Sequence, residues 1–205
     1  MLNDWLETRL ERLGRDGTVL DLGCGRGYWL DRMGARGLAP VGVEYRQDRA
    51  AEYDGDAPVS VGDALHLPFR DASIDLVWSI HVLHHLPDPE AALREVRRVL
   101  RPGGHLVIAE TVEDHPLIRL ARSVRPRWDG VPVHARFSSR TFRALVRECG
   151  LDVVDSRQHS LVSWAAWALP RGQEATWVRL SRMEERLPPS ANRWGAHLEI
   201  VATRG

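Results

Sequence analysis

Three glycines with every-second spacing, Gly23, Gly25 and Gly27, follow the apolar segment Val19–Leu22. Because glycine lacks a Cβ atom, such a run permits a tight turn and lets a ligand approach the backbone closely. A helix that starts after the turn would present unpaired N–H groups and the positive end of its dipole, which suit a cofactor carboxylate. The pattern predicts a cofactor-binding turn, although dinucleotide-binding folds use a glycine-rich turn as well.

An acidic residue, Glu44, ends the second apolar segment, 39–43. In open α/β sheets ligands bind outside the carboxyl ends of the strands, so this carboxylate is well placed to accept hydrogen bonds from two ribose hydroxyls. That geometry serves NAD and an adenosyl cofactor equally. Glu44 therefore predicts a ribose-containing cofactor without distinguishing the two.

Three histidines, His81, His84 and His85, follow the apolar segment 74–79. Residues three and four apart share a face of a helical turn, so the three side chains could converge. Histidine exchanges protons near neutral pH, which makes the group a candidate general base. Packing or loop-holding hydrogen bonds are an alternative. Metal ligation by His81 and His85 is another, but no nearby acid completes a convincing set, so no metal site is predicted.

Apolar segments alternate with helical patterns, which is typical of strands joined by crossover helices in a mostly parallel sheet. We predict strands at 18–22, 39–43, 58–61, 74–79, 105–109, 151–155 and 194–203, and helices at 2–13, 28–36, 48–52, 89–100 and 138–149. Pro102-Gly103-Gly104 is expected to stop the helix at 89–100 before the next strand. Ser138 is expected to cap the helix at 138–149, and Gly150 to end it.

The composition fits one globular domain, with 205 residues, 43% apolar and 27% charged. No apolar run approaches the roughly 20 residues of a membrane-spanning helix. The first residues do not resemble a signal peptide, so we predict a cytoplasmic protein. Cys24 and Cys149 are expected to be reduced thiols. The formal charge of zero argues against a global attraction to nucleic acid. The absence of lysine excludes a lysine Schiff base and a P-loop lysine.

Further motifs complete an ordered set with the glycine turn and Glu44. They occupy 62–64 (GDA), 67–69 (LPF), 74–77 (IDLV), 82–86 (VLHHL) and 98–104 (RVLRPGG). From about Val19 to Glu110 this set resembles the class I S-adenosylmethionine-dependent methyltransferases of the small-molecule and tRNA types. The resemblance implies a Rossmann-like, doubly wound α/β fold over residues 1–205, with a seven-stranded, mostly parallel sheet whose last strand is antiparallel.

The resemblance also implies how S-adenosylmethionine is bound. The three glycines would pass its methionine moiety, with Asp21 on the amino side, and Glu44 would hold the ribose. Asp63 would accept a hydrogen bond from the adenine amino group, and the backbone N–H of Ala64 would reach the ring. Asp63 could instead cap a turn. The other positions expected at the cofactor are Cys24, Tyr45, Leu65 and Ser79.

Methyl transfer from a sulfonium is a direct displacement, which an enzyme promotes mainly by aligning the reacting atoms. A hydroxyl or amine acceptor must also lose a proton, so His81, His84 or His85 could serve as the base. Glu110 ends the predicted strand at 105–109, and the resemblance implies that it orients such a histidine, as in some family members. It could equally be a surface or helix-capping acid.

The acceptor is expected to be a small molecule methylated at oxygen, nitrogen or activated carbon, with segments near 111–137 and 159–190 covering it. Between His115 and Arg147 eight arginines stand against one acid, which indicates solvated helix faces, or else an anionic substrate or partner. The tryptophans of these segments either pack in the core or line an apolar pocket; they are Trp128, Trp164, Trp167 and Trp177.

Three other functions stay open on the sequence. Segments 69–71, 79–80 and 83–85 also resemble tRNA wobble-base methyltransferases, but the neutral charge and the lack of an added RNA-binding module argue against that function. A non-catalytic protein that binds the cofactor and regulates a partner would keep Glu44 and Asp63 as well. A dehydrogenase is disfavoured, because the every-second glycine spacing differs from the dinucleotide pattern.

Overall fold

A computed structural model describes residues 4–13, 17–124, 133–161, 163, 173–184, 186 and 189–205 of the chain. Its strands are β1 (Thr18–Leu22), β2 (Ala39–Glu44), β3 (Val59–Val61), β4 (Ile74–Ile80), β5 (Leu100–Thr111), β6 (Asp152–His159) and β7 (His197–Thr203). The helices are α1 (Asp4–Leu13), α2 (Tyr28–Gly34), α3 (Gln47–Ala50), α4 (Pro89–Val99), α5 (Pro116–Val124), α6 (Ser139–Glu148) and α7 (Gln173–Glu184), with the 3-10 helices η1 (Leu83–His85) and η3 (Pro189–Trp194).

Seven strands of the described chain form one sheet in the order β3-β2-β1-β4-β5-β7-β6. The first five are parallel to one another, while β7 inserts antiparallel between β5 and β6. The chain runs outward from β1 to β3 and then returns to place β4 on the other side of β1. Ligands of open α/β sheets bind at such a reversal, outside the carboxyl ends of the strands. The predicted doubly wound α/β fold is confirmed.

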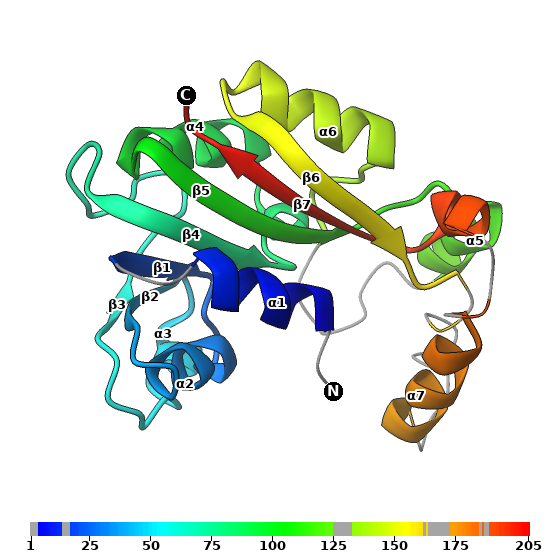
Figure 1. Ribbon diagram of the computed structural model, residues 1–205, viewed down its shortest axis with the longest axis horizontal. Helices are drawn as coiled ribbons and strands as arrows, with labels where there is room; N and C mark the ends of the chain where they lie inside the picture. Colours follow the sequence, from blue (N-terminus) through cyan, green and yellow to red (C-terminus); the bar gives the residue numbers. More distant parts are fainter. Residues whose placement is uncertain are drawn as a thin grey trace.

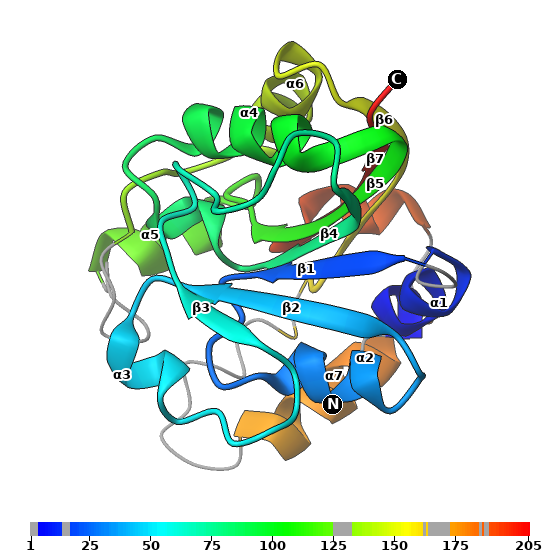
Figure 2. The same ribbon diagram turned by 90° about the vertical axis from the view of Figure 1, so that its left-hand side faces the viewer.

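Helices cover both faces of the sheet (Figures 1 and 2). On one face α4 and α6 share a core with Leu106 and Ile108 of β5. On the other face α1 and α2 share a core with Val107 of β5 and Trp78 of β4. Successive residues of β5 thus point to opposite faces, as the period of a strand requires. Burial on both faces explains why these strands are continuous apolar runs in the sequence.

Side chains cap two of the helices that flank the sheet. At the start of α4, Asp88 accepts a hydrogen bond from the Ala91 N–H at 2.9 Å, and Pro89 is the first helical residue. Before α6, the Ser138 hydroxyl accepts from the Thr141 N–H at 3.1 Å, and the Thr141 hydroxyl accepts from the Ser138 N–H at 3.0 Å. The predicted cap at Ser138 is confirmed. Each such cap stabilises its helix by about 1 kcal/mol.

The prediction for residues 100–104 is wrong. We expected Pro102-Gly103-Gly104 to separate α4 from a strand at 105–109, but β5 begins at Leu100, directly after the helix. Leu100 is wholly buried and pairs with Ile74. The register between β4 and β5 then shifts between Ile74 and Leu76, so the proline and glycines lie within the strand as an irregularity.

The last two strands have other bounds than those predicted. β6 extends to His159 rather than to residue 155, because it pairs with β7 from Asp152 to His159. β7 begins at His197 rather than at residue 194, because residues 189–194 form η3. Both differences arise from pairing between segments that are far apart in the sequence.

No helix among the described residues is long and apolar enough to cross a membrane. Parts of the predicted covering segments lie outside the described residues; they include Trp128, Trp164, Trp167, Arg125, Arg127 and Asp129. Trp177 lies in α7.

The Arg204 guanidinium closes the carboxyl end of α4. Its Nη1 atom donates to the carbonyl oxygens of Arg97 and Arg98, each at 3.0 Å, and to that of Leu100. Arg204→Met removes these charge-assisted bonds, so we expect the free energy of unfolding to fall by about 1–2 kcal/mol in thermal or urea unfolding. Arg94→Met is the control within α4: it removes an exposed ion pair with Glu90 and should cost less than about 0.5 kcal/mol. Equal losses would contradict this role of Arg204.

Candidate active site

The glycine turn joins β1 to α2 at the reversal of the sheet order. Gly23, Gly25 and Gly27 have φ angles of 71°, 55° and 81°, in the left-handed region that glycine tolerates best. There is also little room for a side chain at two of these positions. A Cβ atom on Gly23 would lie 2.4 Å from Cγ2 of Val82, and one on Gly27 would lie 2.0 Å from Cδ2 of Tyr53. The predicted tight turn is therefore present, and side chains at these two positions would disrupt it.

Glu44 holds this turn from the neighbouring strand. One of its carboxylate oxygens accepts a hydrogen bond from the Gly25 N–H at 2.9 Å, and the other accepts from the Arg46 N–H at 2.8 Å. The side chain is buried at the end of β2, whereas the next residue, Tyr45, is 74% exposed. Each carboxylate oxygen has a second lone pair. Glu44 can therefore accept hydrogen bonds from a ligand while it keeps the turn closed.

Asp21 carries a carboxyl group whose hydrogen bonding is incomplete. Its side chain is 2% exposed, and its Oδ2 atom has no hydrogen-bond partner among the described residues. Burial, followed by repulsion from Glu44, raises the pKa of Asp21 from 3.8 to about 8. Burying an unpaired charge is costly, so this carboxyl suits a cationic or hydrogen-donating ligand group. Burial and the two neighbouring carboxyls also raise the pKa of the Cys24 thiol to about 12, which keeps it protonated.

The residues after β3 form a small turn. The Oδ1 atom of Asp63 accepts a hydrogen bond from the Leu65 N–H at 2.9 Å, which is the turn-capping arrangement. The Asp63 side chain is still 43% exposed, so its carboxylate can also meet a ligand. Ala64 is buried. Ser79 is buried near the carboxyl end of β4, and its hydroxyl has no hydrogen-bond partner among the described residues.

The carboxylate of Glu110 organises the loop after β4. Its Oε1 atom accepts hydrogen bonds from the Val82 and Leu83 N–H groups at 3.0 and 2.7 Å, and its Oε2 atom lies 2.6 Å from Nδ1 of His84. Burial alone would raise the pKa of Glu110, but the His84 hydrogen bond, the charges of His84 and His81 and the Leu83 N–H together lower it. When His84 is neutral, an ionised Glu110 makes it the donor through Nδ1–H, which leaves the Nε2 lone pair for another partner.

The other two predicted histidines lie beside this pair. The ring centroid of His85 is 3.9 Å from that of His84, and the centroid of His81 is 6.2 Å from it. His81 is exposed and has a φ angle of 60°. The three rings thus come together, and His84 forms a hydrogen bond with Glu110.

The residues that could hold a metal ion differ from the pair, His81 and His85, that the sequence spacing suggested. Among the described residues, the donor atoms of His81, His84 and Glu110 lie within 4.8 Å of one another, whereas His85 is not part of this group. Both carboxylate oxygens of Glu110 already accept hydrogen bonds from the protein. The arrangement therefore fits a hydrogen-bonded histidine–carboxylate pair better than a metal site.

Sequence reasoning missed a second histidine–carboxylate pair. The Nε2 atom of His159, the last residue of β6, lies 3.0 Å from Oε1 of Glu199 in β7. The Nδ1 atom of His159 lies 2.9 Å from the Ser160 hydroxyl. The sequence carries one signal for this pair: Glu199 is the single acid in the apolar segment 197–203, where a buried charge needs a partner.

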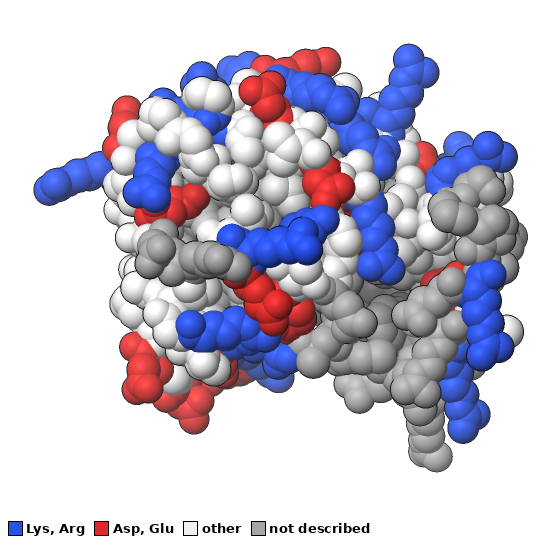
Figure 3. Space-filling model, viewed as in Figure 1, with Lys and Arg blue, Asp and Glu red and all other residues white. Residues whose placement is uncertain are grey.

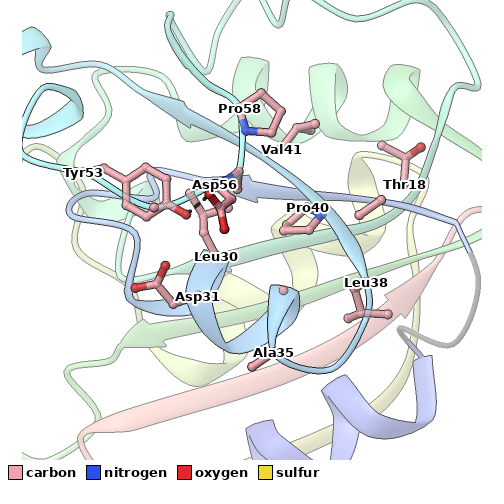
Figure 4. Close-up of a pocket in the computed structure, with 14 residues that line it drawn as sticks. Thr18, Leu30, Asp31, Ala35, Leu38, Pro40, Val41, Tyr53, Asp56 and Pro58 are labelled. Atoms are coloured by element: carbon pink, nitrogen blue, oxygen red, sulfur yellow. Dashed lines mark hydrogen bonds between the residues drawn. The ribbon is translucent and has the colours of Figure 1, made fainter.

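A cavity of about 550 Å³ lies away from both pairs, between α2, the start of β2 and residues 53–58 (Figure 4). Its lining includes Thr18, Leu30 and Tyr53. Thr18 is the first residue of β1, so the cavity reaches the amino end of that strand, whereas the glycine turn follows the carboxyl end. None of the residues predicted for the cofactor or the acceptor is among those that line it.

The reversed strand order, the antiparallel β5-β7-β6 edge and the acid-flanked glycine turn define a Rossmann-like methyltransferase fold. Residues 20–108 match the methyltransferase domain family. The chain belongs to the class I S-adenosylmethionine-dependent methyltransferases.

Several named proteins of this class are similar to the chain. The 27-O-demethylrifamycin SV methyltransferase of Amycolatopsis mediterranei is 36% identical over 160 residues, which are 71% of this chain and 59% of the relative. The methyltransferase GfsG of Streptomyces halstedii is 34% identical over 148 residues, 67% of this chain and 53% of the relative. The methyltransferase solved in complex with a Haloferax volcanii methyltransferase activator has a TM-score of 0.71 and 25% identity, covering 97% of this chain and 88% of that one. The chain thus spans about half to three fifths of these two curated relatives.

The residues around the turn fit S-adenosylmethionine, the cofactor of this family. The incompletely bonded carboxyl of Asp21 suits the ammonium group of the methionine moiety. The left-handed Gly25 leaves the backbone open to a ligand, because a Cβ atom there would meet nothing within 4 Å. Glu44 keeps lone pairs for the ribose hydroxyls.

Asp21→Asn tests the fit. The folded-state pKa of Asp21, about 8, lies above its ordinary value of 3.8, so stability falls as pH rises between these values. The asparagine of the variant does not titrate, so the variant does not lose stability over this pH range. Without cofactor it should melt roughly a few degrees above the wild type near pH 8, and at the same temperature near pH 4. Its affinity for S-adenosylhomocysteine should fall at least about tenfold in calorimetric titration. Unchanged affinity would show that Asp21 does not face the cofactor.

Proposed function

We propose that the protein transfers the methyl group of S-adenosylmethionine to a small-molecule acceptor, at an oxygen or nitrogen that carries a proton. The observation that carries the proposal is the position of Val82. Its side chain packs against Gly23 of the glycine turn, and its N–H group donates to Glu110 at 3.0 Å. One residue therefore joins the turn that suits the methyl donor to the histidine–carboxylate pair that suits proton removal.

The proposed cofactor contacts lie at, or directly after, the carboxyl ends of four strands, β1 to β4. Asp21 would pair with the ammonium group, and Glu44 would accept hydrogen bonds from the ribose. The methionine moiety would be lined by Gly23, Cys24, Gly25 and Gly27. Asp63, Ala64 and Leu65 would meet the adenine, with Tyr45 and Ser79 at the margins of the site. When bound, the cofactor supplies a methyl group on a positively charged sulfur. The protein's part is to align that methyl group with the acceptor and to exclude water.

The proposed base is His84. Because Glu110 receives the Nδ1–H of His84, the Nε2 lone pair can take the proton that the acceptor loses as its bond to the methyl group forms. The resulting imidazolium would be stabilised by the buried carboxylate at 2.6 Å. His81 and His85 would flank the acceptor rather than remove its proton, since His84 is the ring hydrogen-bonded to Glu110.

Several observations support a small-molecule acceptor. One relative is named for 27-O-demethylrifamycin SV, itself a small molecule. On the described part of the face in Figure 3, basic and acidic side chains are interspersed, which does not favour nucleic acid there. Segments near 111–137 and 159–190 are proposed to cover the acceptor, and α5 and α7 lie on the side to which β4 and β6 point (Figure 1). Their arginines and tryptophans favour an anionic or aromatic acceptor.

We also propose that the protein works in the cytoplasm. Cys24 and Cys149 are both buried free thiols, which is the ordinary state of cysteines in a reducing compartment.

The proposed function is tested by cofactor binding and turnover. Calorimetry should show binding of S-adenosylmethionine and S-adenosylhomocysteine, and methyl-labelled S-adenosylmethionine should label members of a panel of small phenols, alcohols and amines. Failure to bind either form of the cofactor would refute the proposal. Binding without labelling of any acceptor would favour a regulatory protein instead.

Glu110→Gln tests the base while keeping the side-chain size. The amide would still accept the two backbone N–H bonds through its oxygen, but its NH2 group would face Nδ1 of His84 and force the proton onto Nε2. We expect kcat to fall by about 10²-fold or more, with the KM for S-adenosylmethionine nearly unchanged. His84→Asn should lose a similar factor, and the double variant should be no worse than either. The control His105→Asn, near the other end of β5, should keep its rate; additive losses would contradict a functional pair.

A further inference from the structure

The two histidine–carboxylate pairs lie on opposite faces of the sheet, both near the carboxyl end of β5. Along β5 and β7, Ala109 pairs with Glu199, and Glu110 pairs with Leu198. Paired residues share a face and successive residues alternate. Leu198 belongs to the core under α4 and α6, so Glu110 points to that face. Glu199 therefore points to the face that α1 and α2 cover.

Two imidazoles connect these pairs around the edge of the sheet. The ring centroid of His81 lies 6.2 Å from that of His84 and 5.2 Å from that of His197. The centroid of His197 in turn lies 5.4 Å from that of His159. These separations are in the range of contacting rings. His81 is exposed and His197 is half-buried, so both can meet a ligand.

The second pair is built to keep its histidine in one orientation. Glu199 is 1% exposed, and because its carboxylate only accepts, His159 donates through Nε2 and accepts the Ser160 hydroxyl at Nδ1. Ser160 is 1% exposed and has a φ angle of 66°. A left-handed residue other than glycine persists where its surroundings over-determine it, and such residues cluster at ligand sites. His81 has the same feature, with a φ angle of 60°.

We propose that Glu199 and His159 are positioning residues that hold His197 beside His81, and that these two imidazoles bind a second oxygen of the acceptor. The first oxygen is the one that His84 deprotonates, so this inference rests on the proposed function. It points to a substrate class: small molecules with two neighbouring oxygen groups. His197 forms a hydrogen bond with the acceptor and takes no part in bond making or breaking.

The chemistry favours recognition of oxygen over simple packing. A neutral imidazole presents one donor and one acceptor, which match a hydroxyl or a carbonyl next to the methylated position. Simple packing would need only apolar side chains here. Instead Glu199 is buried, with Oε1 paired to His159 and Oε2 without a hydrogen-bond partner among the described residues, and such burial is costly.

Catechol, with two adjacent hydroxyls, and phenol, with one, are the probes for this inference. The protein saturated with S-adenosylhomocysteine is titrated with each, and the Kd values and the imidazole NMR signals are recorded. We expect catechol to bind at least about tenfold more tightly than phenol, the gain of one well-made hydrogen bond. Catechol should also shift the signals of His81 and His197, whereas phenol should leave the His197 signal in place.

Two variants separate binding from folding. His197→Ala should weaken catechol about tenfold and leave phenol within roughly twofold. Glu199→Gln, which keeps the side-chain size, should weaken catechol several-fold with the same selectivity, because His159 loses its orientation. His105→Ala, near the other end of β5, is the control and should change neither probe. Unchanged affinity for S-adenosylhomocysteine shows that each variant is folded.

Equal weakening of both probes in His197→Ala, or equal binding of catechol and phenol to the wild type, overturns the inference. Binding of neither probe overturns it as well. In each of these cases S-adenosylhomocysteine still binds and the proposed cofactor stands. Loss of S-adenosylhomocysteine binding by the wild type would instead refute the proposed function itself.

Discussion

The buried carboxylate of Glu110 connects three strands of the sheet. From the end of β5 it accepts the N–H groups of Val82 and Leu83 and pairs with His84, all from the loop after β4. A buried carboxylate stays ionised only with such donors, so the loop cannot move away without leaving an unpaired charge. Val82 then lies against Gly23, at the end of β1. The geometry of the glycine turn is thus constrained by an acid two strands away.

The three buried acids around the glycine turn and the loop after β4 are of two kinds. Glu44 and Glu110 receive hydrogen bonds from backbone N–H groups, and these bonds hold the local fold. The Oδ2 atom of Asp21 lacks a partner among the described residues, and burial raises its pKa to about 8. Natural binding sites often keep such a destabilised group, because a ligand satisfies it and stability elsewhere compensates. Glu44 and Glu110 thus hold the site in shape, whereas Asp21 is left to bind the ligand.

Features that depend on interactions between neighbouring residues could be predicted from the sequence, and features that depend on distant residues could not. The glycine turn, the strand at 18–22 and the cap at Ser138 depend on neighbouring residues, and the structure places them as expected. The start of β5 at Leu100 and the extension of β6 to His159 depend on pairing with distant strands, which local patterns do not contain. Spacing likewise grouped His81, His84 and His85 but could not indicate which one meets Glu110.

The position of β7 has a consequence for how the sheet opens. β6 is an edge strand whose sheet partner among the described strands is β7 alone, so β6 stays joined to the rest of the sheet only as long as β7 stays paired with β5. The two strands should therefore exchange their amide hydrogens as one cooperative unit, at a lower free energy than β1 and β4 in the centre of the sheet. His159, His197 and Glu199 all belong to that unit. The strands proposed to recognise the acceptor can thus loosen and re-form while the half of the sheet that suits the cofactor stays folded.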